Sequence, residues 1–463
     1  MQPRVDAATR PGALDLDNLP LVIALDGVLL RSNPVHEAYA AGLGELLQSP
    51  RQALAALAGG DRSVRGWLTS LSAIDYGKLP YEPAILNLAL SARAQQRKVY
   101  LATANNAVHA AAIAAHFGLD GIVALDAQGA FADADDPKVQ NLRHNGFEYV
   151  GSDHPAAAAH RTSAGDVGGA GRHTGLREWL AALRVHQYAK NVLVFVPLLT
   201  SHHFNLPSLG NAVLAFLAFS TCASSAYLLN DILDLRADRH HPIKCHRALA
   251  SGTLPIASAL IAIPCLAATS LIIATAVSWL FLMTIVAYLV ITMAYSFHLK
   301  KMLLVDIIAL AGLYTTRILG GAIAIDVHLS EWLLIFSLFV FTSLALIKRY
   351  GELTMRQGAR LADPINRDYR IGDLNIVAAL AAASGMNAIT VFSLYISSPA
   401  VTSAYSSPWL LWMLDPLLLY WIGRALMIAH RQAMQDDPIV YTFKDGPSRI
   451  TVLLMTCIAL AAI

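Results

Sequence analysis

Short and long apolar runs alternate with polar stretches in two different ways along this chain of 463 residues. Up to about residue 150 the runs are short. "PLVIALDGVLL" and "KVYLATANN" are typical of buried parallel strands, and "HAAAIAAHFGL" has the pattern of a helix that follows one. Alternating strands and helices predict an α/β domain over residues 1–155.

Nine longer apolar segments follow residue 177. They lie near 192–201, 208–229, 254–274, 276–297, 305–325, 331–348, 374–396, 409–429 and 450–463. A membrane-spanning helix needs about 20 apolar residues, so the first and the last are short. The pattern predicts an all-α, multi-pass membrane domain of about nine transmembrane helices over 177–463. Residues 156–176, rich in Gly, Ala and Ser without periodicity, are expected to form a linker.

Composition supports this reading of the pattern. Hydrophobic residues make up 56% of the chain and charged residues only 14%, against about 25% charged in soluble proteins. A net charge of +2 gives no reason to expect nucleic acid as a partner. The first residues contain no apolar h-region, so no cleavable signal peptide is expected.

The loop charges predict an orientation. Sixteen Lys and Arg residues follow the second, fourth, sixth and eighth segments: Arg236, Arg239, Lys244, Arg247, Lys300, Lys301, Lys348, Arg349, Arg356, Arg360, Arg367, Arg370, Arg424, Arg431, Lys444 and Arg449. The alternate loops carry none. Because cytoplasmic loops are enriched in Lys and Arg, these loops and the N-terminal domain are expected in the cytoplasm.

Three carboxylates lie where the second segment meets that side, in "NDILDLRAD". Asn230, Asp234 and Asp238 are spaced four apart, and Asp231 is three before Asp234. A continuing helix would place them on neighbouring parts of one face. Such carboxylates repel one another unless a cation offsets them, and Mg²⁺ with substrate phosphates suits the site. The alternative is a solvated acidic helix end, which the helix dipole disfavours.

Other polar groups at or inside the segments are candidates for substrate contacts. They are Arg184, Gln187, Lys190, Asn191, Arg247, Tyr295, Lys300, Asp306, Tyr314, Arg317, Lys348, Arg349 and Glu352. Ionisable groups in apolar segments usually face a cavity. A structural ion pair is the alternative for a lone Asp or Arg, and a topology signal or lipid contact is the simpler interpretation for most boundary Lys and Arg.

The membrane part resembles the UbiA superfamily of intramembrane prenyltransferases. "NDILDLRAD" matches the NDxxDxxxD motif of that superfamily, whose nine helices surround a cytoplasm-facing cavity. Its aromatic prenyltransferases have a second aspartate-rich motif after the sixth helix, where this chain has "KRYGEL". With "LRVHQYAKN" and "DPIVYTFKDGPSR", this loop resembles the branch that contains decaprenyl-phosphate phosphoribosyltransferase. The chain departs from the commoner "RPxQWxKN" at Val185 and Tyr188.

The resemblance implies transfer of 5-phosphoribose from phosphoribosyl diphosphate to a polyprenyl phosphate, in a bacterial-type inner (cytoplasmic) membrane. It assigns Asp231, Asp234 and Asp238 to catalysis as ligands of Mg²⁺, with Asn230 orienting the diphosphate. Cationic partners for the phosphates would come from Lys190, Arg247, Lys300, Lys348 and Arg349. The product would feed D-arabinose donors for glycans, and some relatives are associated with nodulation signals.

The N-terminal domain resembles the haloacid-dehalogenase (HAD) phosphatases, which have a Rossmannoid α/β fold. Asp26 and Gly27 match the end of their DxDG motif, but Ala24 replaces the nucleophilic aspartate. Thr103 fits the second motif, and Lys138 and Asp153 are weaker matches. Because alanine cannot form a phospho-enzyme, the domain is expected to be a catalytically defective HAD-like unit with a regulatory, folding or partner-binding role. A coincidental α/β domain is the alternative.

Other functions stay open at this point. A UbiA-type enzyme could transfer a prenyl chain from prenyl diphosphate to an aromatic acceptor, although the missing second aspartate motif counts against it. A non-catalytic scaffold or transporter-like bundle would not depend on Asp231 or Asp234. A membrane-tethered phosphatase is disfavoured by Ala24. Membrane lipid is an expected partner in every case, and a homo-oligomer is compatible with the sequence.

Overall fold

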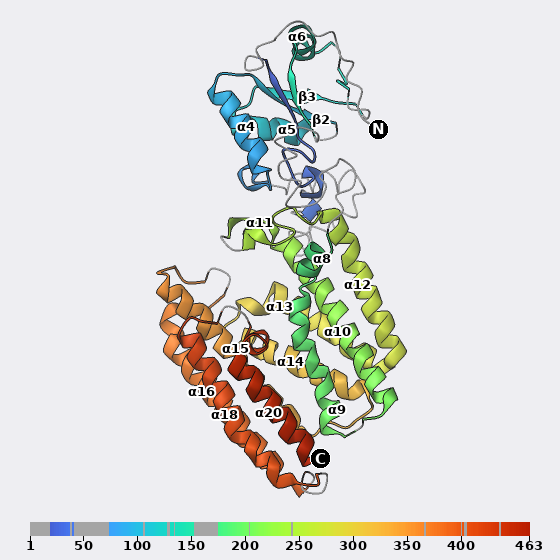
Figure 1. The fold of residues 1–463 in the computed structure, drawn as a ribbon, viewed down its shortest axis with the longest axis vertical. Coiled ribbons are helices and arrows are strands. Elements are labelled where there is room, and N and C mark those ends of the chain that lie inside the picture. The colour runs from blue at the N-terminus through green and yellow to red at the C-terminus, as the bar shows by residue number, and fades with distance from the viewer. Residues whose placement is uncertain are drawn as a thin grey trace. The chain divides into compact units, whose positions relative to one another are not determined.

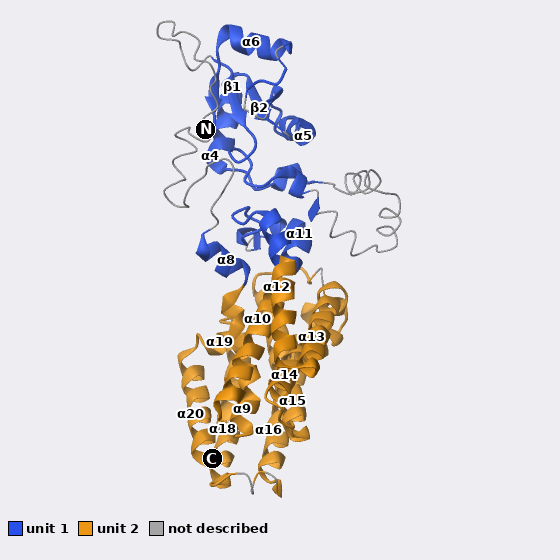
Figure 2. Ribbon diagram, turned by 90° about the vertical axis from the view of Figure 1, so that its right-hand side faces the viewer, with its two compact units in different colours: residues 1–183, 228–262 blue, residues 184–227, 263–463 orange. Residues whose placement is uncertain are grey.

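The chain divides into two compact units, coloured separately in Figure 2. The computed structural model describes residues 19–37, 39–40, 74–104, 107–126, 130–133, 135–151, 175–202, 204–241, 244–364, 367–399, 401, 405–434 and 437–463. The first unit comprises residues 1–183 and 228–262, and the second comprises 184–227 and 263–463. Most of the predicted linker lies outside the described residues. The segment that carries the three aspartates belongs to the same unit as the N-terminal domain.

Four parallel strands form the sheet of the first unit in the order β3-β2-β1-β4. They are β1 (Leu21–Ala24), β2 (Val99–Thr103), β3 (Gly121–Ala124) and β4 (Glu148–Val150). Leu21 is in register with Val99 on one side and with Glu148 on the other. The strands predicted in "PLVIALDGVLL" and "KVYLATANN" are β1 and β2, so the N-terminal parallel α/β fold is confirmed.

Helices cover both faces of this sheet (Figure 1). Leu21 and Ile23 pack with α4 (Pro83–Ala94) and α5 (Ala107–Phe117), whereas Val22 packs with α6 (Pro137–Asn145). Alternate residues of a strand point to opposite faces, so one short apolar strand serves two layers. The remaining elements of this unit include η2 (Tyr76–Lys78), α8 (Leu176–Ala182), α11 (Leu235–His240) and η4 (Lys244–His246).

Seven helical segments in the described chain are long and apolar enough to cross a membrane. They are α10 (Leu206–Leu233), α12 (Ile256–Val277), α13 (Trp279–Phe297), α14 (Val305–Ala324), α15 (Glu331–Gly358), η6 (Ile371–Asp373) with α16 (Leu374–Ile396), and η7 (Pro408–Met413) with α18 (Leu414–His430). The chain is therefore a multi-pass membrane protein. Shorter elements connect or follow these segments: η5 (Leu299–Lys301) and α19 (Pro438–Thr442).

Seven of the about nine predicted segments reach membrane length in the described chain, and the first and the last form shorter helices. Segment 192–201 is divided between a 3-10 helix, η3 (Val185–Phe195), and the short α9 (Val196–Thr200). Segment 450–463 lies in α20 (Gly446–Ala462), whose 17 residues extend about 26 Å at 1.5 Å each. That is less than the hydrocarbon core of about 30 Å. Apolar composition identified both segments, but it does not measure their helical length.

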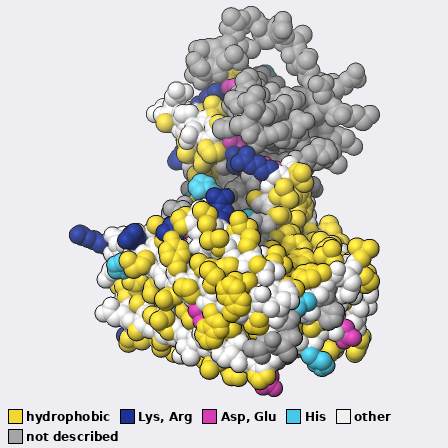
Figure 3. Space-filling view, turned by 60° about the horizontal axis from the view of Figure 1, so that its bottom comes forward, with side chains coloured by type: hydrophobic (Ala, Val, Ile, Leu, Met, Phe, Trp, Pro, Cys, Tyr) yellow, Lys and Arg dark blue, Asp and Glu magenta, His cyan; other side chains and the backbone are white. Residues whose placement is uncertain are grey.

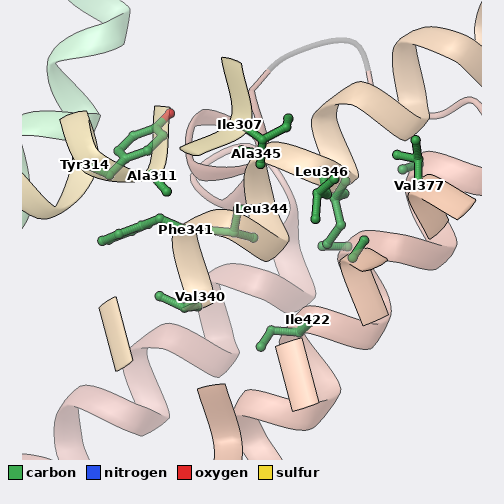
Figure 4. Close-up of a cluster of buried hydrophobic side chains, with 14 of the residues drawn as sticks. Ile307, Ala311, Tyr314, Val340, Phe341, Leu344, Ala345, Leu346, Val377 and Ile422 are labelled. Carbon is green, nitrogen blue, oxygen red and sulfur yellow. The ribbon is translucent and has the colours of Figure 1, made fainter. Parts of the chain in front are cut away.

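The second unit has an apolar core and an apolar surface. Side chains of α14, α15, α16 and α18 form its largest cluster (Figure 4), where the ring of Tyr314 stacks on that of Phe341 at 5.1 Å. Hydrophobic side chains also cover much of the face seen in Figure 3. Exposed Trp279, Ile272 and Leu280 belong to two of the membrane-length helices, as expected where the solvent is lipid.

A close approach of α14 to η3 depends on Gly321. A Cβ atom at this position would overlap the backbone carbonyl of Val194. We expect Gly321→Ala to lower the stability of the protein by about 1–3 kcal/mol, because backbone has to move. Gly312→Ala is the matched control on the same helix, since its Cβ would meet nothing within 4 Å. Thermal midpoints in detergent that fall equally for both variants would contradict this packing.

Candidate functional site

The aspartate motif spans the end of α10 and the first four residues of α11. The predicted continuous helix is interrupted: α10 ends at Leu233, and Asp234 has backbone angles of −89° and 4° before α11 begins. The amides of Asp234 and Asp238 still donate to the carbonyls four residues earlier, at 2.9 and 2.8 Å. The motif therefore keeps its helical spacing across the break.

Two of the three carboxylates converge on one cationic group. Arg247 Nη1 lies 3.1 Å from Asp231 Oδ1 and 2.6 Å from Asp238 Oδ2. Both aspartates are buried. The third, Asp234, accepts a hydrogen bond from the amide of Asn230 at 2.9 Å. The guanidinium thus marks a point where positive charge offsets two buried carboxylates.

This arrangement bears on the predicted metal site. Within the described chain, no three His, Cys, Asp or Glu side chains are grouped so that they could hold a metal ion together. Magnesium, however, is usually held by one or two carboxylates with waters and substrate phosphates. Asp231 and Asp238 meet that requirement, because both already direct an oxygen at a single cation. Direct metal contacts of Asp231, Asp234 and Asp238 stay predictions.

A second cluster, in the other unit, surrounds Asp437. Its carboxylate accepts from Lys190 Nζ at 3.0 Å, from Lys348 Nζ at 3.2 Å and from the Tyr314 hydroxyl at 2.9 Å. These groups come from η3, α15 and α14, and Asp437 is the N-cap of α19. Burial alone would raise the pKa of Asp437, but the two lysines outweigh it and hold the pKa well below its usual range. Asp437 was not among the sequence candidates.

The Asp437 cluster continues into a network of neutral and cationic groups. Arg317 Nε donates to Asn191 Oδ1 at 2.8 Å, and its Nη2 donates to the Tyr288 hydroxyl at 2.7 Å. Asn191 in turn donates to Ser220 at 2.9 Å. The guanidinium also lies 5.5 Å from the ring centre of Tyr314. Arg317 and Asn191 are both buried, so they brace η3 against α14 beside the two lysines.

A third cluster pairs the other candidates with each other. Arg349 Nη2 donates to Asp306 Oδ2 at 2.7 Å, and the Tyr369 hydroxyl donates to Asp306 Oδ1 at 2.7 Å. Arg349 and Asp306 are 1% and 0% exposed. Glu352 accepts a further bond from Arg349. The alternative of a structural ion pair thus fits Asp306 and Arg349 as they lie, and a substrate contact of these three residues stays a prediction.

The remaining substrate candidates lie in other places. Arg184, with a left-handed φ of 54°, precedes η3 and carries its guanidinium 4.9 Å from the ring centre of Tyr227. Gln187 follows in η3, Tyr295 lies near the end of α13, and Lys300 is in η5.

In the α/β domain the structure brings together two of the residues that were matched to the HAD motifs. Thr103, the last residue of β2, donates through its hydroxyl to Asp26 Oδ2 at 2.8 Å. Ala24 ends β1, so all three lie at the carboxyl edge of the sheet. Lys138 does not join them, because its Nζ lies 3.1 Å from the Cβ position of Gly121, the first residue of β3. Asp153 is outside the described residues.

Comparisons with known proteins bear on the membrane part and on the whole chain. The family model for the UbiA prenyltransferase family matches residues 192–444. The uncharacterized protein y4nM of Sinorhizobium fredii is 32% identical over 94% of this chain and 90% of its own. Nodulation protein NoeC of Azorhizobium caulinodans is 33% identical over 60% of this chain and 93% of its own.

A further relative carries an activity in its name. The decaprenyl-phosphate phosphoribosyltransferase of Mycobacterium tuberculosis is 34% identical over 39% of this chain and 62% of its own length. Among solved structures, a UbiA homolog from Archaeoglobus fulgidus bound to GPP and Mg²⁺ aligns with 62% of this chain and 99% of that one. Its sequence identity is 15% and its TM-score 0.48.

Proposed function

This chain belongs to the UbiA prenyltransferase family, and we propose that it catalyses the Mg²⁺-dependent transfer of 5-phosphoribose from phosphoribosyl diphosphate to a polyprenyl phosphate. The family makes it a transferase with a phosphorylated lipid as a plausible substrate. The donor and the acceptor are our inference, supported by the similarity to decaprenyl-phosphate phosphoribosyltransferases.

The observation that carries this proposal is the cationic character of the Asp437 cluster. Lys190 and Lys348 bring two ammonium groups to one carboxylate, which leaves one positive charge in excess. Where aromatic prenyltransferases are expected to have a second aspartate-rich motif, α15 carries Lys348 and Arg349. A donor with a 5-phosphate in addition to its diphosphate favours such positive partners, whereas carboxylates would repel it.

The residues of the chain take the following roles in this proposal. Asp231 and Asp238, with Asp234, would hold the Mg²⁺ that accompanies the diphosphate, and Asn230 holds Asp234 in place. The metal, when bound, offsets charge on the leaving diphosphate. Lys190 and Lys348 bind a phosphate of donor or acceptor. An oxygen of the lipid phosphate attacks the anomeric carbon, whose bond to the diphosphate breaks with the electron pair leaving on diphosphate, so no protein nucleophile is required.

The cellular setting follows from the same proposal. The basic loops after α10, α13, α15 and α18 are expected at the cytoplasmic face of an inner membrane. There the α/β domain would meet a soluble sugar diphosphate. The product would supply polyprenyl-linked D-arabinose donors for glycans, and the similarity to NoeC extends this to the arabinosylation of nodulation signals. The α/β domain is proposed to be HAD-like without phosphatase turnover, since Ala24 offers no nucleophile.

Transfer of label to lipid tests the proposal. Full-length protein in detergent, given phosphoribosyl diphosphate labelled in the ribose and a panel of polyprenyl phosphates, is expected to form labelled lipid in Mg²⁺ and none in EDTA. Prenylation of an aromatic acceptor by prenyl diphosphate, without transfer of ribose label, would replace the proposal by the aromatic prenyltransferase. Absence of both reactions would favour a non-catalytic scaffold.

A further inference from the structure

Helix α11 carries Asp238 but is too short to hold its own position. It has six residues, whereas isolated helices shorter than about 12–15 residues are marginal in water. Leu235 and Asp238 are buried, yet the helix follows a break at Asp234 rather than continuing α10. Its orientation, and with it the position of the Asp238 carboxylate, therefore depends on tertiary contacts within its unit as well as on the helical hydrogen bonds that continue across the break.

One of these contacts is an ion pair with the N-terminal domain. Arg239 Nη1 and Nη2 donate to Glu37 Oε2 and Oε1 at 2.8 and 2.7 Å, a two-point pairing that fixes the plane of both groups. The side chains are only 9% and 4% exposed. Arg239 Nε donates to the Ala250 carbonyl at 3.1 Å. One guanidinium thus joins α11, the following loop and the α/β domain.

Glu37 follows β1, the strand that ends at Ala24, in the chain. The chain leaves β1 through buried Leu29 and Leu30 and turns into a helical stretch at Asn33. The Asn33 side chain accepts the amide of Val35 at 2.9 Å, and its carbonyl accepts the amide of Glu37 at 3.1 Å. This is N-cap geometry, and it places Glu37 in the first turn of this helical stretch.

A second contact reaches the same loop independently. Gly252 has a φ of 72°, and a Cβ there would lie 3.0 Å from Arg31 Cβ and 3.0 Å from Pro80 Cγ. Both neighbours belong to the α/β domain, where the Arg31 amide donates to the Pro80 carbonyl at 3.0 Å. His240 on α11 also pairs with Asp75 of this domain at 3.0 Å. Helix α11 and the loop that follows it therefore contact the α/β domain through Arg239, His240 and Gly252.

We propose that the N-terminal domain is a positioning element of the transferase. Glu37, acting through Arg239, fixes α11 so that the carboxylates of Asp238 and Asp231 both contact the guanidinium of Arg247. This assigns a task to a domain in which Ala24 stands where the resembled HAD motif has its nucleophile. Because Arg239 follows Asp238 directly on a helix of six residues, a rotation of α11 that releases the guanidinium also displaces the carboxylate. The catalytic consequence rests on the proposed function, whereas the structural one does not.

Hydrogen exchange of full-length protein tests the structural consequence. We compare the wild type, Glu37→Gln and Gly252→Ala in detergent without substrate. The glutamine keeps the size of Glu37 but leaves Arg239 without its buried counter-charge, so amides of residues 235–241 are expected to exchange at least tenfold faster in both variants. Glu148→Gln is the control. Glu148 lies on β4 of the same domain, and the substitution removes its ion pair with Arg97.

The dependence of transfer on Mg²⁺ tests the catalytic consequence. Loss of a group that orients a metal ligand costs about 10–100-fold in metal affinity, so Glu37→Gln is expected to raise the half-saturating Mg²⁺ concentration by about tenfold. The maximal rate at saturating Mg²⁺ should change much less, and Glu148→Gln should match the wild type. A merely structural contact would lower the amount of folded protein without moving this concentration.

The outcomes separate the two proposals. Wild-type protein without transfer activity would overturn the proposed function, while exchange at 235–241 would still decide whether Glu37 positions α11. Exchange in Glu37→Gln and Gly252→Ala that equals the wild type would overturn the positioning proposal. Faster exchange with an unchanged Mg²⁺ requirement would restrict the role of Glu37 to folding and overturn its effect on Asp238.

Discussion

Asp231→Asn is expected to lower the rate of phosphoribosyl transfer by about 10³-fold. The substitution removes one of the two carboxylates that converge on Arg247 Nη1. A bound metal contributes several kcal/mol of charge stabilisation, and about 1.36 kcal/mol corresponds to a tenfold change in rate. The asparagine oxygen can still accept the Arg247 bond, so folding should be preserved. Initial rates of label transfer over a range of Mg²⁺ concentrations measure the effect.

Asp363→Asn is the matched control for this prediction. Asp363 is an exposed carboxylate in the basic loop after α15, and its Oδ1 accepts the Ile371 amide at 2.9 Å. An asparagine accepts the same bond, so the variant should transfer label at the wild-type rate. Full activity in Asp231→Asn, at any Mg²⁺ concentration, would remove Asp231 from the catalytic site.

The pattern of apolar residues predicted those elements whose structure depends only on a local run of the sequence. β1 and α10 follow from a buried apolar run and from a run of membrane length, and the structure confirms both. The failures lie where apolar composition does not fix geometry. Residues 185–195 form a 3-10 helix of 11 residues, although such helices rarely exceed 3–4. The break at Asp234 likewise has no proline or glycine to announce it.

The residue types of the candidate site could be predicted from the sequence, but the pairing of these residues in space could not. "NDILDLRAD" stands out because acids interrupt an apolar run, and Lys190 and Lys348 because they adjoin one. Asp437 has no such signal: it lies 247 residues from Lys190 in sequence, and only its position before Pro438 marks a helix start. Glu37 was missed for the same reason, since its partner Arg239 is 202 residues away. Long-range pairing of charges depends on the assembled fold.

The contacts of Asp437 lead to the second large effect: Asp437→Asn is expected to destabilise the protein by about 3–5 kcal/mol, because two ammonium groups then lose their buried anion. The thermal midpoint in detergent measures the loss. Adding Lys190→Gln to the variant should restore part of it, since one unpaired charge is removed. Asp326→Asn makes the same chemical change at an exposed position of left-handed φ that asparagine tolerates, and should leave the midpoint unchanged.

The pH dependence gives a further check on the Asp437 variant. The pKa of Asp437 is lowered in the folded protein, where Lys190 and Lys348 outweigh burial. Its stabilisation is therefore fully present above the unfolded-state pKa of about 3.9 and is lost only as the pH falls further. The stability difference between wild type and Asp437→Asn should then be constant from about pH 5 to 8. A difference that changes across this range would show that another group is responsible.

Binding of pyrophosphate tests whether the lysines of the Asp437 cluster bind a substrate phosphate. If Lys190 and Lys348 bind a substrate phosphate, the variant without the Asp437 carboxylate offers an added anion two uncompensated charges. A ligand that binds only the folded protein stabilises it in proportion to its affinity, so pyrophosphate should raise the midpoint of Asp437→Asn more than that of the wild type. Equal shifts in both proteins would mean that these lysines serve the fold alone, and that the phosphates bind elsewhere.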